Sequence, residues 1–147
     1  MTVTPDIVLL VEDDPNDVLL MQRAFRRAQV TNPVQVVGDG EDAVSYLSGK
    51  APYADRVRYP LPAVILLDLK LPRKSGLEVL EWLRQQTGLK RLPVVVLTSS
   101  KESTDISRAY DLGVNSYLVK PVSFDTLLAM VETLNSYWLQ LNEKPIV

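Results

Sequence analysis

Residues 63–76 read AVILLDLKLPRKSG, five apolar residues that run directly into an aspartate. A continuous apolar run without polar alternation is typical of a strand buried on both faces of a parallel sheet, because helices cover both sides. Asp68 stands where this run stops, and Pro72 and Gly76 shape the loop that follows. We therefore expect the Asp68 carboxylate at the carboxyl edge of a strand, where open α/β sheets bind their ligands.

Four further short apolar runs alternate with segments of helical periodicity, which indicates a repeated βαβα pattern. Asp14 before Pro15, Asp39 and Ser123 are typical of helix starts, whereas Gly49 and Gly113 are typical of helix ends. The expected strands are residues 7–11, 33–37, the opening stretch, 93–98 and 116–119, with a short helix over 103–112 and a long loop over 48–62. The expected apolar helix faces are Val18, Met21, Phe25 and Ala28; Ala43, Val44 and Leu47; Leu77, Leu80 and Leu83; and Leu127, Val131 and Leu134, with Trp138 at the same helical spacing.

This alternation predicts an α/β fold, a doubly wound five-stranded parallel sheet of the flavodoxin-like kind with strand order 2-1-3-4-5. In that order the first and third strands are neighbours, and the fourth and fifth strands continue on the side of the third. The residues after the carboxyl ends of these strands are therefore expected to meet in one crevice. They are Glu12, Asp13, Asp68, Thr98 and Lys120.

Composition limits the possible functions. With 147 residues, 46% hydrophobic and 23% charged, the chain has the size of one globular domain, residues 1–147. A net charge of −2 argues against nucleic acid as a partner. The absence of cysteine and histidine excludes disulfides, thiol nucleophiles, histidine-based triads and the commonest transition-metal ligands. No signal pattern or membrane-spanning apolar run is apparent, so we expect a cytoplasmic protein without a membrane partner.

The predicted group of carboxylates needs a cation, because like charges a few ångströms apart repel one another. Mg²⁺ prefers oxygen ligands and is typically held by one or two carboxylates plus a phosphate. A carboxylate such as Asp68 can also attack a phosphoryl group and form an aspartyl phosphate. Lys120 and Thr98 would then stabilise the phosphoryl oxygens by charge and by a hydrogen bond.

Each of these residues also has an ordinary structural interpretation. Asp14 is best explained as a helix cap, Thr98 could simply end a strand, and Lys120 could be a surface lysine. Tyr117 could be a core aromatic residue. It is their combination in motifs that points to function.

Four motifs carry a family resemblance: VEDD at 11–14, LLDLKLP at 66–72 with Gly76, LTS at 97–99 and YLVKP at 117–121. Together they resemble the receiver domain of two-component response regulators, with a core over about residues 6–138 and a C-terminal extension over 139–147. The resemblance implies a histidine kinase as the partner and a cis peptide bond before Pro121. It further implies that Asp68 is the phosphoacceptor, that Glu12, Asp13, Asp68 and the Lys70 carbonyl bind Mg²⁺, that Lys120 contacts the phosphoryl group and that Thr98 and Tyr117 form the switch pair.

The long loop over 48–62 and the lack of an output domain further resemble the small regulators that partner phytochrome-type histidine kinases, mainly cyanobacterial ones. We therefore expect a stand-alone response regulator and not an enzyme. The alternative is a Mg²⁺-dependent phosphatase of the haloacid-dehalogenase type. Enzymes that resemble this type carry the motif DxDx[TV] at the nucleophile, and the second aspartate of the motif is the acid–base group. Lys70 stands at that position here. A nucleotide-binding domain is disfavoured because the EDDPND turn contains no glycine.

The C-terminal stretch NSYWLQLNEKPIV, residues 135–147, places large apolar side chains at and beyond the end of the last helix. These are Tyr137, Trp138, Leu139 and Leu141, of which the last three are expected to extend past the sheet edge. An exposed patch of this kind is typical of an interface. We expect a homodimer through the fourth helix, fifth strand and fifth helix, with the tail contributing.

Overall fold

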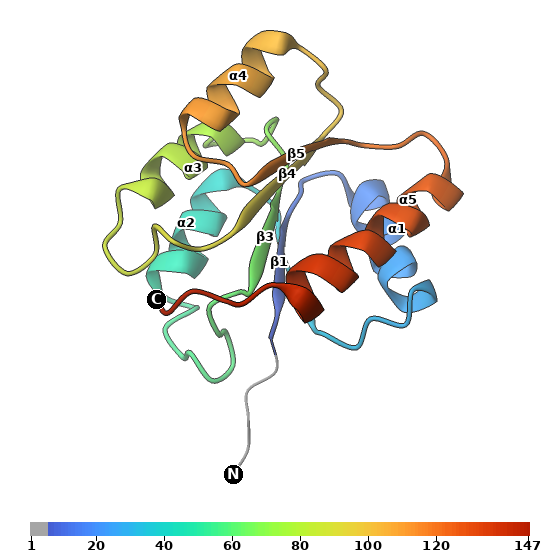
Figure 1. Ribbon diagram of the computed structural model, residues 1–147. Helices are drawn as coiled ribbons and strands as arrows, with labels where there is room; N and C mark the ends of the chain where they lie inside the picture. The colour runs from blue at the N-terminus through green and yellow to red at the C-terminus, as the bar shows by residue number, and fades with distance from the viewer. Residues whose placement is uncertain (1–5) are drawn as a thin grey trace.

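Five parallel strands form the central sheet in the order β2-β1-β3-β4-β5, with helices on both faces (Figure 1). The computed structural model describes residues 6–147, so the first five residues of the predicted domain lie outside the described chain. The strands are β1 (Val8–Val11), β2 (Val34–Val37), β3 (Val64–Leu67), β4 (Val94–Thr98) and β5 (Ser116–Val119). The helices are α1 (Pro15–Arg27), α2 (Gly40–Ser48), α3 (Gly76–Arg84), α4 (Ser103–Asp111) and α5 (Phe124–Leu134), followed by the π-helix η1 (Asn135–Leu141). The predicted fold and strand order are confirmed.

The core has two layers, one on each face of the sheet. Successive strand residues point to opposite faces, so Leu9 and Ile65 pack with the α2, α3 and α4 side, whereas Leu10 and Leu66 pack with α1 and α5. Both layers are covered by helices (Figure 1). This double coverage explains why the central strands contain only apolar residues.

The predicted helix signals are observed as hydrogen bonds. The Asp14 and Asp39 carboxylates each accept from a backbone N–H in the first turn of the following helix, at 2.8 and 2.7 Å. Ser123 caps α5 in the same way, at 3.1 Å. Gly49 ends α2 in the left-handed conformation with φ of 72°, which suits glycine because a side chain would be strained there.

Several details of the predicted elements were wrong. The first strand begins at Val8 and the short helix ends at Asp111, whereas residues 7 and 112 were expected. Val18, Ala28 and Val44 are only half-buried. Val79, not Leu77, joins Leu80 and Leu83 on the buried face of α3, and Leu77 is only half-buried. The second and fourth strands begin one residue after the predicted proline. Pro33 and Pro93 accept hydrogen bonds from neighbouring strands through their carbonyl oxygens, but proline has no N–H with which to continue the ladder.

The C-terminal segment differs most from expectation. The chain continues from α5 into η1, and Trp138 and Leu139 pack against the core layer beneath α1 and α5. The prediction that both extend past the sheet was therefore wrong, whereas Tyr137 and Leu141 are 52% and 73% exposed. Beyond η1 the tail runs across the end of the sheet (Figure 1). This end carries the amino ends of β3 and β4, and there Lys144 forms an ion pair with Asp6.

The long loop between α2 and β3 is held by an aromatic cluster. The rings of Tyr46, Tyr53 and Tyr59 pack with centroids 5.0 to 6.0 Å apart. The Tyr53 hydroxyl donates to the Asp42 carboxylate at 2.9 Å. The Arg56 guanidinium donates to carbonyl oxygens at the end of α2, at 2.7 and 2.8 Å, and so ties this loop to the helix. Within residues 6–147, no helix has the length and apolar character needed to cross a membrane.

Candidate functional site

Backbone hydrogen bonds bring three polar residues to one edge of the sheet. The N–H of Glu12 donates to the Val37 carbonyl at 3.1 Å, and the N–H of Asp68 donates to the Val11 carbonyl at 3.1 Å. The N–H of Lys120 donates to the Thr98 carbonyl at 2.8 Å. Each bond extends a parallel ladder by one residue, so these side chains start at the same level beyond the strands.

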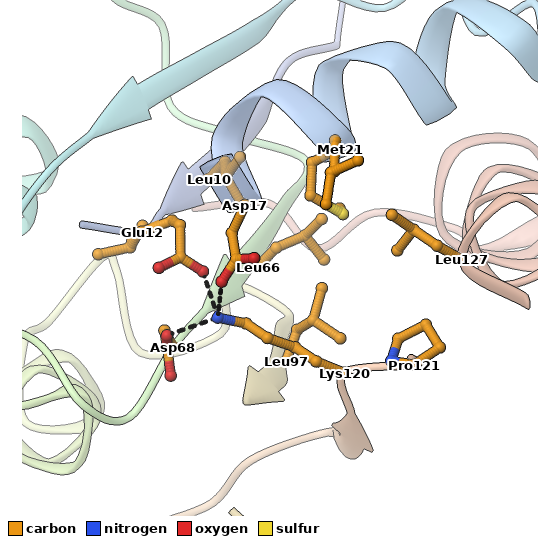
Figure 2. Close-up of a pocket in the computed structure, with 12 residues that line it drawn as sticks. Leu10, Glu12, Asp17, Met21, Leu66, Asp68, Leu97, Lys120, Pro121 and Leu127 are labelled. Atoms are coloured by element: carbon orange, nitrogen blue, oxygen red, sulfur yellow. Dashed lines mark hydrogen bonds and ion pairs between the residues drawn. The ribbon is translucent and has the colours of Figure 1, made fainter. Parts of the chain in front are cut away.

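Lys120 lies at the centre of the site (Figure 2). Its ammonium Nζ is 2.6 Å from Glu12 Oε1, 2.9 Å from Asp68 Oδ2 and 2.8 Å from Asp17 Oδ2. The carboxylates come from the ends of β1 and β3 and from the first turn of α1. An ammonium has three N–H donors, and here each can meet a separate carboxylate.

Three carboxylates lie close enough to hold one cation. One oxygen from each of Glu12, Asp13 and Asp68 lies within 4.8 Å of the others. Glu12 and Asp68 are only 4% and 7% exposed, whereas Asp13 is exposed. Burial raises the pKa of the Glu12 carboxyl above its ordinary value, although hydrogen bonds from Lys120 and the Asp14 backbone act in the opposite direction. An all-oxygen donor set with buried negative charge fits a hard divalent cation.

Asp17 is a site residue that sequence analysis missed. Burial alone would lower the pKa of Lys120, but hydrogen bonds to Asp17, Glu12 and Asp68 together raise it above its ordinary value. Lys120 therefore stays charged. Asp17 is three residues beyond the Asp14 cap, and its place in the first turn of a helix could have been read only as support for the helix dipole.

The predicted switch residues lie on the neighbouring strands. Thr98 ends β4 and is completely buried, and its hydroxyl oxygen is 3.5 Å from the Ser100 N–H. Tyr117 on β5 is half-buried, and its hydroxyl donates to the Ser100 carbonyl at 3.0 Å. Burial raises the pKa of the Tyr117 phenol. Both residues thus meet the same loop after β4.

Two further expectations concern the backbone. Lys70 follows Asp68 closely, and its N–H, which belongs to the Leu69–Lys70 peptide, donates to Asp68 Oδ1 at 3.3 Å. The metal-binding role expected for the Lys70 carbonyl stays a prediction. The cis bond expected before Pro121 is wrong, because in the described chain the cis peptide bond is Ala51–Pro52. The isomer of an X-Pro bond depends on tertiary context, which residue types alone do not reveal.

Comparison with known proteins gives a consistent result. Residues 8–132 match the response regulator receiver domain. The "Probable methanogenesis regulatory protein FilR2" of Methanothrix harundinacea is 41% identical, with 96% of this chain and 88% of that protein covered. The response regulator Rcp1 of Synechocystis sp. is 39% identical, with 92% and 90% covered.

Solved structures agree with these relatives. The phosphorylated cyanobacterial phytochrome response regulator RcpA has a TM-score of 0.89 and 38% identity, covering 96% of this chain and 99% of that one. The Mn²⁺-bound form of Rcp1 has a TM-score of 0.86 and 38% identity, with the same coverage. The similarity to cyanobacterial phytochrome response regulators expected from the sequence is therefore confirmed, and the chain belongs to the response regulator receiver domain family.

Proposed function

We propose that this chain is a response regulator that accepts a phosphoryl group on Asp68 from a histidine kinase and thereby changes its interaction surface. The observation that carries the proposal is the Asp68 carboxylate, buried at the sheet edge with the Lys120 ammonium 2.9 Å away. A nucleophile beside a fixed cation at this position suits phosphoryl transfer.

The residues present fit Mg²⁺. Glu12, Asp13 and Asp68 would hold it, and the carbonyl of Lys70, two residues after Asp68, would be a further ligand. When bound, the ion would neutralise the carboxylates and the charge of the incoming phosphoryl group. The Mn²⁺-bound form of Rcp1 supports a divalent cation in this family.

The proposed reaction is a direct transfer. A carboxylate oxygen of Asp68 attacks phosphorus, so a phosphorus–oxygen bond forms while the bond from phosphorus to the donor histidine nitrogen breaks. The imidazole leaves with the electron pair. Lys120 would compensate the charge of the phosphoryl oxygens, and the Thr98 hydroxyl would donate a hydrogen bond to one of them.

The switch would follow from the change in charge. An aspartyl phosphate carries more negative charge than a carboxylate and offers more acceptor oxygens, which would attract Thr98. Displacement of the loop at Ser100 would weaken the Tyr117 hydrogen bond and let this ring rotate. The surface that would change comprises α4, β5 and α5. This surface would bind a protein and not a nucleic acid.

Exposed apolar side chains on α1 and directly after Pro121 support a protein as the phosphodonor. Leu19 and Leu20 on α1 are 63% and 42% exposed, and Val122 is fully exposed. Leu20 lines the same pocket as Asp68 and Pro121. A protein carrying phosphohistidine could cover these residues. The similarity to RcpA and Rcp1 supports a phytochrome-type kinase as that protein.

A homodimer is proposed for the face that includes β5 and α5. Leu118, Leu134, Tyr137 and Trp138 line a groove there. The partial burial of Trp138 within its own chain leaves Tyr137 as the main exposed ring. Sedimentation velocity from low to high micromolar concentration tests this interface. Tyr137→Lys should shift the protein to monomer, whereas Leu19→Lys on α1 should not; an effect of both or neither would reject the interface.

Phosphatase activity remains the alternative, because it uses the same nucleophile. The experiment is incubation with acetyl phosphate, with Mg²⁺ or with excess chelator, followed by intact mass. The proposal predicts one added phosphoryl group only with Mg²⁺. Addition in chelator would reject the metal requirement, and continuous turnover of a soluble phosphate ester would favour the phosphatase.

A further inference from the structure

The Lys120 ammonium is held by one carboxylate that does not belong to the group of possible metal ligands. Glu12 and Asp68 are members of that group, but Asp17 is not. The Asp17 side chain is 33% exposed, compared with 4% and 8% for Glu12 and Asp68. Among the described residues, the ion pair that joins Asp17 to the site is its contact with the Lys120 ammonium (Figure 2).

This contact joins two elements that are distant in sequence. Asp17 lies in the first turn of α1, and Lys120 lies between β5 and α5, 103 residues away. The Asp14 cap and Pro15 start α1 directly after the carboxylates of β1. The segment from the end of β1 to the first turn of α1 thus supplies two of the possible metal ligands, Glu12 and Asp13, and also Asp17, the third partner of Lys120.

We propose that Asp17 is a positioning residue that fixes the position of the Lys120 ammonium and lowers the affinity of the site for a phosphoryl group attached to Asp68. The ammonium donates hydrogen bonds to Asp17 and Asp68 at 2.8 and 2.9 Å and forms an ion pair with Glu12 at 2.6 Å. A phosphoryl oxygen can replace Asp68 as one of these acceptors. Asp17 remains bound, compensates part of the lysine charge and repels the phosphoryl oxygens.

The inference rests on the proposed function, since it assumes that Asp68 receives the phosphoryl group. It goes beyond that function by assigning to α1 a residue that favours the unphosphorylated state. Asparagine at position 17 would keep the shape and an acceptor oxygen for Lys120 but would remove the charge. Glutamate would keep the charge and can still reach the ammonium.

The test is the affinity for beryllofluoride, a phosphoryl analogue, measured by calorimetry at saturating Mg²⁺. Asp17→Asn should bind beryllofluoride about three- to fivefold more tightly than the wild type, the effect of a partly exposed ion pair. Asp17→Glu should stay within about twofold of the wild type. Asp125→Asn is the matched control, because Asp125 lies in the first turn of α5 but has no ion pair within the described residues.

A second titration separates positioning from a general loss of structure. With Mg²⁺ alone, Asp17→Asn should bind the ion equally or more weakly, because a less compensated Lys120 repels it. Unfolding would weaken the binding of both ligands. A higher affinity for beryllofluoride without a higher affinity for Mg²⁺ therefore supports the proposal. Unchanged or weaker beryllofluoride binding by Asp17→Asn, or an equal gain in Asp125→Asn, would overturn it. A wild type that binds no beryllofluoride would overturn the proposed function, and this inference with it.

Discussion

The Tyr117 hydroxyl donates a hydrogen bond to the carbonyl oxygen of Ser100 at 3.0 Å, which ties β5 to the loop that follows β4. The same loop contacts Thr98 through the Ser100 N–H. Tyr117→Phe should lower the free energy of unfolding by about 1 kcal/mol, because the Ser100 carbonyl loses its partner. Urea unfolding measures this loss. Phosphorylation by acetyl phosphate should proceed to the same extent, and its disappearance would mean that Tyr117 acts in the transfer itself.

Lys120→Ala removes the cation shared by Glu12, Asp17 and Asp68. Without Mg²⁺ the variant should be less stable by about 1–3 kcal/mol, because these partly buried carboxylates then repel one another. Mg²⁺ should bind at least as well as to the wild type and restore part of the stability. Thermal unfolding with and without Mg²⁺ measures both effects. Because the proposed switch surface includes β5 and α5, phosphorylation of the wild type should change the affinity of the proposed dimer. Lys120→Ala should lose most of this change, and an undiminished change would contradict the assigned role of Lys120.

Tyr53 gives the long loop a predictable response to pH. Burial, followed by the hydrogen bond to Asp42, raises the pKa of Tyr53 to about 12 from an ordinary value of 10.0. A raised folded-state pKa means that its stabilising contribution is complete below pH 10 and is lost as pH rises towards 12. Tyr53→Phe should lower the free energy of unfolding by about 1 kcal/mol at neutral pH, and this difference from the wild type should vanish as the pH rises from 10 to 12. Denaturant unfolding at each pH is the measurement, with Tyr137→Phe as the exposed control; a difference independent of pH would contradict it.

Gly76 has no space for a side chain. A Cβ atom at this position would lie 2.1 Å from the backbone oxygen of Asp68, whereas nothing lies within 4 Å of a Cβ at Gly38. Gly76→Ala should therefore displace the loop after β3 and destabilise the protein by about 1–3 kcal/mol or more. Gly38→Ala should leave the free energy of unfolding almost unchanged. Equal effects of the two variants in urea unfolding would show that this close approach is relieved without cost.

The sheet order and the place of Asp68 could be predicted because both follow from local patterns. Apolar runs without alternation identify strands covered on both faces, and the connection rules for parallel strands then determine which ends meet. This reasoning placed Glu12, Asp68 and Lys120 at one edge, where the structure brings them together. Their roles in metal binding and phosphoryl transfer remain predictions.

Other features depend on contacts that no local pattern contains. Asp17 meets Lys120 across 103 residues, and its position in the first turn of a helix looks like an ordinary dipole contact. The π-helical end of the chain depends on a shift in hydrogen-bond register, which lets Trp138 and Leu139 pack on the core layer of α1 and α5. Apolar residues at a helix end therefore could not be assigned to a core or to an interface from the sequence.

The central claim is that Asp68 is the residue that carries the phosphoryl group. The most direct measurement is borohydride reduction after phosphorylation by acetyl phosphate with Mg²⁺, which converts an aspartyl phosphate to homoserine, followed by peptide mass mapping. We predict homoserine at position 68 and no conversion in Asp68→Asn. Homoserine at Asp13 or Asp17, or conversion that persists in Asp68→Asn, would contradict the claim.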